Sequence, residues 1–162
     1  MSKRKGSSAE RELAALLRDQ YGFKVRRGYL MIGEPDLVGL DGIHIEAKRH
    51  ERPQMSTWLQ QAIIASQKYG GFPTVFSRAS RRPWYVTMRE ADWREMGGIE
   101  CEVDARYRFD FNDRMADLKS DALLWRRQEV MVSMRLEDWV GLYASWIVPF
   151  GRGDNVSNNQ EW

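Results

Sequence analysis

Two acidic residues and one lysine form the part of this sequence best suited to chemistry. Asp36 follows Glu34-Pro35, and Glu46 and Lys48 lie on the far side of a short turn. Carboxylate oxygens are ligands that hard divalent cations such as Mg²⁺ prefer. An ammonium group beside such a cation can orient or deprotonate a water, or stabilise charge developing on a phosphorane. Brought together, the three side chains would be a minimum set for hydrolysing a phosphodiester.

The segment between these residues predicts a β-hairpin, and its loop decides whether the acids meet. A strict two-residue turn at Asp41-Gly42 would pair Asp36 with Ala47 and put Asp36 and Glu46 on opposite faces. A three-residue loop, Leu40 to Gly42 with Gly42 left-handed in a G1 bulge, pairs Asp36 with Glu46 instead. We predict the bulged loop because it separates polar from apolar side chains. One face would then carry Asp36, His44, Glu46 and Lys48, and the other Leu37, Ile43, Ile45 and Ala47.

Solvated charges on the polar face of a hairpin are the alternative interpretation. A lone Glu-x-Lys is a weak signal, but Pro35-Asp36 at the matching position and apolar flanking strands favour a site. His44 could be a further ligand on this face, although a plain polar strand residue is the favoured interpretation. His50 is interpreted as a surface residue beside Arg49.

Composition indicates a folded globular protein with one core and an appendage. The chain has 162 residues, of which 12% are aromatic and 43% hydrophobic. A single cysteine, Cys101, excludes an internal disulfide and fits a reducing compartment. No apolar run approaches a membrane span, and the basic start of the sequence lacks the apolar region of a secretory signal. We therefore expect a cytoplasmic, DNA-associated protein that is neither secreted nor bound to a membrane.

The net charge of +2 conceals an asymmetry along the chain. Residues 1–82 hold 15 Lys and Arg against 8 Asp and Glu, whereas residues 83–162 hold 10 against 15. The basic half also contains the carboxylates and the lysine, which favours nucleic acid over ordinary solvated surface. The segments that could neutralise phosphates are Lys3-Arg4-Lys5, Arg26-Arg27, Lys48-Arg49, Arg52, Arg78 and Arg81-Arg82.

The pattern up to residue 88 predicts the order αβββαββ, an α/β or α+β layer structure. A capping box at Ser7 and Glu10 predicts the start of a first helix that ends at Gly22. Next come a strand from Phe23 to Val25, a loop from Arg26 to Glu34, and the hairpin. Ser56 is expected to cap a helix that reaches Tyr69 and ends at Gly70-Gly71, followed by strands 73–77 and 84–88 around a basic turn.

The second half of the chain gives weaker signals. Residues 86–93 resemble residues 132–139, and each segment predicts a strand end, a Thr or Ser cap and a helix opened by acids. Residues 112–127 predict a helix, and residues 151–162 a polar, frayed tail. We divide the chain into a core at 1–88, an acidic, Trp-rich extension at 89–150 packed on the core or on a dimer partner, and a tail at 151–162.

With these residues in place, the first half of the chain resembles the archaeal-type Holliday junction resolvases, a branch of the PD-(D/E)XK nuclease superfamily. The similarity runs from about Lys5 to Met88 and rests on an ordered set of motifs. These are Arg4-Lys5-Gly6, Ala9-Glu10-Arg11-Glu12-Leu13, Gly22-Phe23-Lys24-Val25 leading into Arg26, Pro35-Asp36-Leu37-Val38, Ile45-Glu46-Ala47-Lys48 and Tyr69-Gly70-Gly71-Phe72-Pro73. The bulky loop at 27–34 and the extension past Met88 depart from the family pattern.

The resemblance implies a restriction-endonuclease-like αβββαβ core with a mixed central sheet and assigns roles to individual residues. Asp36 and Glu46 would ligate Mg²⁺, with Mn²⁺ as a substitute, helped by the Ala47 carbonyl. Lys48 would position the attacking water, and Glu10 would act near the metal through water. Arg11, Arg26 and Arg78 match basic positions of the family. Together with the basic segments named from the charge pattern, the residues expected to face DNA are Lys3, Arg4, Lys5, Arg11, Arg26, Arg27, Arg49, Arg78, Arg81 and Arg82.

The resemblance further implies a homodimer that cuts opposing strands of a four-way junction, with a function in DNA recombination and repair. The products would carry 5′-phosphate and 3′-hydroxyl ends. Two alternatives remain. One is a restriction- or repair-type nuclease of the same fold acting on duplex or flap DNA. The other is a catalytically silent DNA-binding module, which the intact set of Asp36, Glu46 and Lys48 disfavours.

Overall fold

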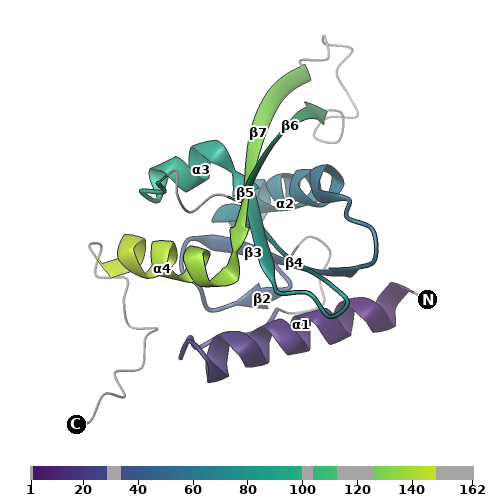
Figure 1. Cartoon of the computed structure of the whole chain (residues 1–162), viewed down its shortest axis with the longest axis vertical. Helices are drawn as coiled ribbons and strands as arrows, with labels where there is room; N and C mark the ends of the chain where they lie inside the picture. The colour runs from purple at the N-terminus through teal and green to yellow at the C-terminus, as the bar shows by residue number, and fades with distance from the viewer. Residues whose placement is uncertain (1, 29–33, 100–103, 113–125, 149–162) are drawn as a thin grey trace.

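A mixed β-sheet organises the described part of the chain, which comprises residues 2–28, 34–99, 104–112 and 126–148 of a computed structural model (Figure 1). Within these ranges seven strands follow the order β1-β2-β3-β4-β5-β7-β6. β3 and β4 run parallel, and every other neighbouring pair is antiparallel. The bounds are Arg26–Arg27 for β1, Leu37–Val38 for β2, Ile43–His50 for β3, Phe72–Ala79 for β4, Tyr85–Arg89 for β5, Ala105–Asn112 for β6 and Arg126–Arg135 for β7.

Helices cover both faces of this sheet. Their bounds are Ser2–Asp19 for α1, Met55–Tyr69 for α2, Glu90–Glu95 for α3 and Leu136–Ile147 for α4. Through residue 89 the elements follow the predicted order αβββαββ, and the mixed α+β architecture agrees with a restriction-endonuclease-like fold. None of the helices in the described ranges is long and apolar enough to cross a membrane.

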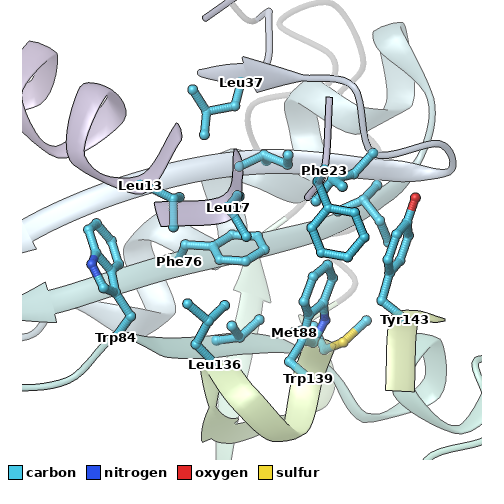
Figure 2. Close-up of a cluster of buried hydrophobic side chains, with 14 of the residues drawn as sticks. Leu13, Leu17, Phe23, Leu37, Phe76, Trp84, Met88, Leu136, Trp139 and Tyr143 are labelled. Atoms are coloured by element: carbon cyan, nitrogen blue, oxygen red, sulfur yellow. The ribbon is translucent and has the colours of Figure 1, made fainter. Parts of the chain in front are cut away.

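Strand alternation gives the two sheet faces different cores. Ile45 and Ala47 of β3 and Phe76 of β4 belong to the larger core, which Leu13 and Leu17 of α1 and Trp139 of α4 cover (Figure 2). Val75 and Met131 point to the opposite face and pack with the buried side of α2, formed by Leu59, Ala62 and Ile63. Glu46 and Lys48 alternate with Ile45 and Ala47, so their side chains lie on the α2 face.

The predicted bulged hairpin is confirmed. Leu37 pairs with Ile45, which is the register of the three-residue loop. One residue earlier, the Asp36 N–H donates to the Ile45 carbonyl at 2.8 Å rather than to Glu46. Gly42 has φ +75°, and the Ile43 N–H donates to the Leu40 carbonyl at 3.2 Å. A left-handed residue closes this loop, which suits glycine because it has no Cβ.

The two similar segments of the second half meet in the sheet. β5 and β7 pair antiparallel with Thr87 opposite Ser133, and their hydroxyls lie 3.1 Å apart. Each strand runs directly into a helix, α3 or α4, as predicted. The predicted Thr and Ser caps are wrong: the N-cap residues are Arg89 and Arg135, and neither makes a side-chain cap hydrogen bond.

Several other element boundaries differ from the predictions. α1 begins at Ser2, so Ser7 is interior to the helix and no capping box opens it there. Gln54 rather than Ser56 occupies the N-cap of α2. The first strand is Arg26–Arg27 rather than 23–25, because these residues pair with β2 while Phe23 joins the core.

The helix predicted for residues 112–127 is wrong at both ends. Asn112 closes β6, and Arg126 and Arg127 open β7 in register with it, so long-range pairing overrides the local helical pattern. The middle of that prediction, residues 113–125, lies outside the described residues, as do the tail at 151–162 and most of the loop expected between Arg26 and Glu34.

Candidate active site

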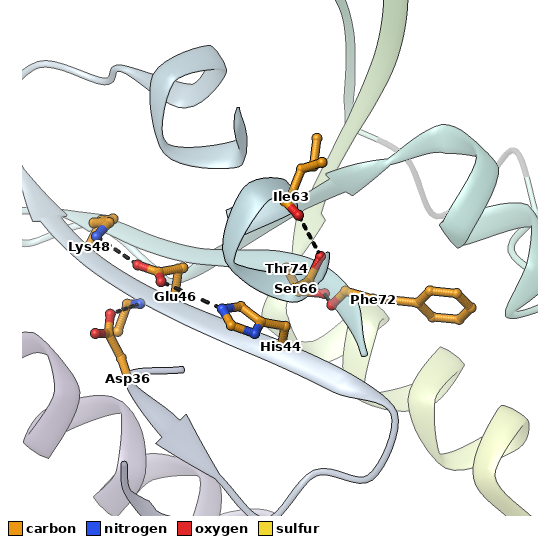
Figure 3. A network of polar contacts seen from close by, with 9 residues as sticks. Asp36, His44, Glu46, Lys48, Ile63, Ser66, Phe72 and Thr74 are labelled. Atoms are coloured by element: carbon orange, nitrogen blue, oxygen red, sulfur yellow. Dashed lines mark hydrogen bonds and ion pairs between the residues drawn. The ribbon is translucent and has the colours of Figure 1, made fainter. Parts of the chain in front are cut away.

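Three side chains meet on one edge of the β2–β3 hairpin (Figure 3). Oδ2 of Asp36 accepts a hydrogen bond of 2.8 Å from the Ala47 N–H. Nζ of Lys48 donates to Oε2 of Glu46 at 2.9 Å, and both residues are on β3. β2 begins only at Leu37, so Ala47 has no strand partner on this side and its N–H is free for the carboxylate. The end of the short strand thus creates the site.

The Asp36 carboxyl is unfavourable as an anion in this environment. Burial is the main cause, and the neighbouring Glu46 carboxylate adds to it, so that the pKa of Asp36 rises to about 6. The Ala47 N–H and the Lys48 ammonium oppose the increase, while Glu10 reinforces it. Asp36 therefore lacks enough positive charge around it, which a bound cation would supply.

Glu46 and Lys48 are both held in their charged forms. Burial alone would raise the pKa of Glu46, but the His44 imidazole and the Lys48 ammonium outweigh it and leave the pKa below its usual value. Burial would lower the pKa of Lys48, but Glu46, Asp36 and Glu10 outweigh burial and raise it. The site is therefore a negative cluster with one fixed cation at its edge.

His44 is almost completely buried beneath α2 on the same face as Glu46. Its exposed fraction is 1%, and its Nε2 lies 3.8 Å from Oε1 of Glu46. That separation is longer than a hydrogen bond, and neither ring nitrogen has a hydrogen-bond partner within the described residues. The predicted face is confirmed, but the burial of His44 was not visible in the sequence, because the strand pattern does not reveal where α2 lies.

Glu10 reaches the site from α1. Its Oε2 accepts a hydrogen bond of 2.7 Å from Nε of Arg27 and forms an ion pair with Nη2 of the same residue at 2.6 Å. Its carboxylate contributes to the pKa of both Asp36 and Lys48, which places it within electrostatic reach of the hairpin. Arg27 is therefore the ion-pair partner of an acidic residue, a contact that the sequence did not reveal.

The donor set fits a divalent cation that also binds waters and phosphate oxygens. Within the described residues no group of three or more His, Cys, Asp or Glu side chains converges on a metal position. Mg²⁺, however, is commonly held by one or two carboxylates plus water and substrate. Asp36 and Glu46 supply the carboxylates. The Ala47 carbonyl faces the same open edge as its N–H, because the two groups of a strand residue point the same way.

The predicted DNA-facing residues fall into separate groups. Arg49 and Arg78 lie on the α1 face, opposite Glu46 and Lys48, and both pair with Glu12. Arg81 and Arg82 are exposed in the turn between β4 and β5. Arg11 and Arg26 are also exposed. Lys3, Arg4 and Lys5 belong to α1, but their side chains lie outside the described set.

Comparison with known proteins agrees with this geometry. Residues 1–99 match the model of a family described as "Phage putative PDDEXK endonuclease". The matched segment contains α1, the hairpin, α2 and β4 to α3, and therefore every residue of the cluster. No curated protein matches the chain.

Proposed function

The chain belongs to this phage PDDEXK endonuclease family, within the PD-(D/E)XK nuclease superfamily, and we propose that it is a Mg²⁺-dependent DNA endonuclease that resolves four-way (Holliday) junctions. The observation that carries the proposal is the meeting of Asp36, Glu46 and Lys48 at one edge of the hairpin. The resemblance of residues 5–88 to junction resolvases supports the substrate.

Asp36 and Glu46 would hold the metal, with the Ala47 carbonyl beside them. The bound cation would supply positive charge for the phosphate oxygens and lower the pKa of a coordinated water. Lys48 would orient the attacking water and stabilise charge on the phosphate, since its pKa keeps it protonated. The water oxygen adds to phosphorus, and the bond between phosphorus and the 3′ oxygen breaks. A proton released by the water ends on the 3′ oxygen, so the cut strand has one 3′-hydroxyl end and one 5′-phosphate end.

Glu10 and Arg27 form the second layer of the proposed site. Glu10 would act near the metal through water, and the ion pair at 2.6 Å would fix its position on α1. Arg27 connects this pair to the hairpin, since β1 pairs with β2. These contacts restrict the carboxylates before substrate binds, which lowers the cost of organising the site.

The charge of the chain supports nucleic acid as the substrate. The family match covers the basic part of the sequence, and exposed arginines follow β4. Two sites in a homodimer would permit paired cuts in opposing strands of a junction, so we propose that arrangement for this chain.

Cleavage of a labelled immobile four-way junction in Mg²⁺ tests the proposal, with linear duplex and a flap as parallel substrates. Asp36→Asn should abolish paired nicks, and Asp41→Asn should not, because Asp41 is exposed in the turn of the same hairpin. Mn²⁺ should replace Mg²⁺.

Other outcomes would replace the proposal. Cutting of linear duplex that depends on Asp36 would indicate a restriction- or repair-type enzyme. Junction binding without cleavage in either metal would leave a DNA-binding module and overturn the catalytic roles of Asp36, Glu46 and Lys48.

A further inference from the structure

A hollow lies on the same sheet face as Glu46 and Lys48. It has a volume of about 680 Å³, within the range of small-molecule sites. β4, β5 and β7 form its floor, and the start of α2 and the turn after β4 form its rim. The residues that matter for its chemistry are Met55, Ser77, Arg82, Tyr85, Met131 and Arg135.

This hollow, which we call the β5 cavity, is adjacent to the catalytic lysine. Ser77, on its floor, is the register partner of Lys48 in the parallel pair of β3 and β4. Adjacent strands lie about 4.8 Å apart, so the two side chains stand next to each other on one face. His50, another wall residue, follows Lys48 by two positions on that face, roughly 6.6 Å along the strand.

The inner surface of the β5 cavity suits a flat, largely apolar group with polar edges. Met55 and Met131 are thioethers that adapt to irregular shapes, and Tyr85 is a half-buried aromatic ring. The Ser77 hydroxyl donates to Sδ of Met55 at 3.9 Å, a weak acceptor that a better one could replace. A nucleobase has both features, an aromatic face and hydrogen-bonding edges.

The rim of the β5 cavity is positively charged. Arg82 and Arg135 are both exposed, and the Arg135 guanidinium lies 5.9 Å from the centre of the Tyr85 ring. Arg135 forms an exposed ion pair with Glu137 at 3.7 Å. Exposed pairs are weak, so a phosphate could displace Glu137 from Arg135. An apolar slot with two arginines at its entrance complements a nucleotide, whose base is apolar on its faces and whose phosphate is anionic.

A cavity on the opposite face provides a contrast. It measures about 750 Å³ and lies between α1 and the start of α4. Three carboxylates line it, those of Glu12, Asp19 and Glu137, together with Arg78 and with Arg82, which borders both cavities. Glu12 pairs with Arg78 and Arg49. Carboxylates outnumber arginines in this cavity, whereas no carboxylate of the described residues lines the β5 cavity. The sheet also separates it from Lys48.

We propose that the β5 cavity receives an unstacked nucleobase of the DNA strand next to the phosphodiester that is cut. This inference rests on the proposed nuclease function and identifies what its substrate must provide. Extruding a base costs least where DNA is already unpaired or distorted, as at a branch point. The cavity would thereby restrict cleavage to distorted DNA, with Tyr85 and Arg135 as specificity-determining residues.

Fluorescence of 2-aminopurine, placed singly at positions flanking the cut in a junction, tests base capture. The full-length protein is added in EDTA so that no cleavage occurs. We expect a several-fold increase at one position, because 2-aminopurine brightens when it leaves the base stack. Tyr85→Leu should remove most of this increase and weaken cleavage roughly fivefold to a hundredfold, the range for loss of one base–aromatic stack.

Matched variants separate capture from folding. Tyr21→Leu changes an equivalent residue of the opposite cavity and should behave as wild type. Arg135→Met alters an exposed side chain and should reduce the signal even if Tyr85→Leu unfolds. A junction with an abasic site at the responsive position should be cut equally by wild type and Tyr85→Leu, since no base remains to be captured.

The two proposals fail in different ways. If Asp36-dependent cleavage occurs but no flanking 2-aminopurine brightens, or Arg135→Met and folded Tyr85→Leu keep the full signal, the base site is overturned and the nuclease stands. If Tyr85-dependent brightening occurs and no DNA is cut in Mg²⁺ or Mn²⁺, the base site stands and the nuclease proposal falls.

Discussion

The N–H of Ala47 and the carboxylate of Asp36 are joined by a 2.8 Å hydrogen bond across the open end of the hairpin. This bond uses a backbone group that a longer β2 would have paired. It fixes one oxygen of Asp36 beside the strand that carries Glu46 and Lys48. A main-chain contact therefore positions the first carboxylate, and strand alternation positions the second.

The stability of the metal-free protein should decrease as pH rises through the titration of Asp36. Its pKa is about 6 in the folded state and near 3.8 when unfolded, so the folded state binds the proton more tightly. Ionisation between about pH 4 and pH 6 therefore costs stability, up to about 3 kcal/mol for two pKa units. Urea unfolding in EDTA should show Asp36→Asn gaining stability over wild type across this window.

Asp41→Asn is the control for that series. The Asp41 carboxyl is exposed in the turn, so the free energy of unfolding of Asp41→Asn should match that of the wild type at every pH. A constant difference between Asp36→Asn and wild type from pH 4 to pH 7 would contradict the raised pKa.

A divalent cation should stabilise the protein, and its removal should reverse the effect. At a hundredfold excess over its Kd, a ligand that binds only the folded state contributes about 2.7 kcal/mol. We expect the Tm of the wild type to increase with Mn²⁺ or Mg²⁺ at neutral pH and to return to its metal-free value in EDTA. The Tm of Asp36→Asn and of Glu46→Gln should not change when metal is added. A response retained in both variants would place the metal elsewhere.

Loss of the lysine should impair chemistry but not metal binding. Lys48→Met should reduce kcat by about 10²- to 10³-fold, the usual effect of removing one electrostatic contact to a transition state. The increase in Tm with metal should persist, because both carboxylates remain. Lys24→Met, which alters an exposed lysine, should cleave at the wild-type rate. Equal rates for both variants would remove Lys48 from the mechanism.

Salt dependence should distinguish two arginines of the basic half. Arg82 is exposed in the turn that borders the β5 cavity and the opposite cavity, whereas Arg78 pairs with Glu12 on the α1 face. Arg82→Gln should reduce the slope of log K against log salt by about 0.9, the value for one phosphate contact. Arg78→Gln should leave the slope unchanged, and the opposite ranking would mean that DNA contacts the α1 face.

Two adjacent glycines should differ in their tolerance of a side chain. Both have positive φ, but a Cβ on Gly71 would lie 2.8 Å from the His44 nitrogen, whereas one on Gly70 would meet nothing within 4 Å. Gly71→Ala should lower the free energy of unfolding by about 2–4 kcal/mol, from strain and overpacking. Gly70→Ala should cost about 1–3 kcal/mol from its conformation alone, because φ +80° with ψ 178° is a combination that essentially only glycine adopts. Equal urea midpoints would contradict this contact.

Local rules determined a large part of the site. The register follows from the Asp41-Gly42 loop and the need to bury one face, so neighbouring residues alone predict the register in which Leu37 pairs with Ile45. The element order through Arg89 was also readable, because Gly70 and Gly71 end α2 and apolar runs mark β4 and β5.

Tertiary structure decided what depends on residues far apart in the chain. β7 pairs with β5 across the sequence, and the first part of β7 pairs with β6, so Arg126 and Arg127 lie in a strand rather than in the predicted helix. α2 buries His44, and Glu12 of α1 takes up Arg49 and Arg78. The β5 cavity requires five elements to meet, namely β3, α2, β4, β5 and β7. Turn geometry and side-chain alternation are determined by residues adjacent in the sequence. Burial, ion pairing between elements and cavities arise only when distant segments pack together.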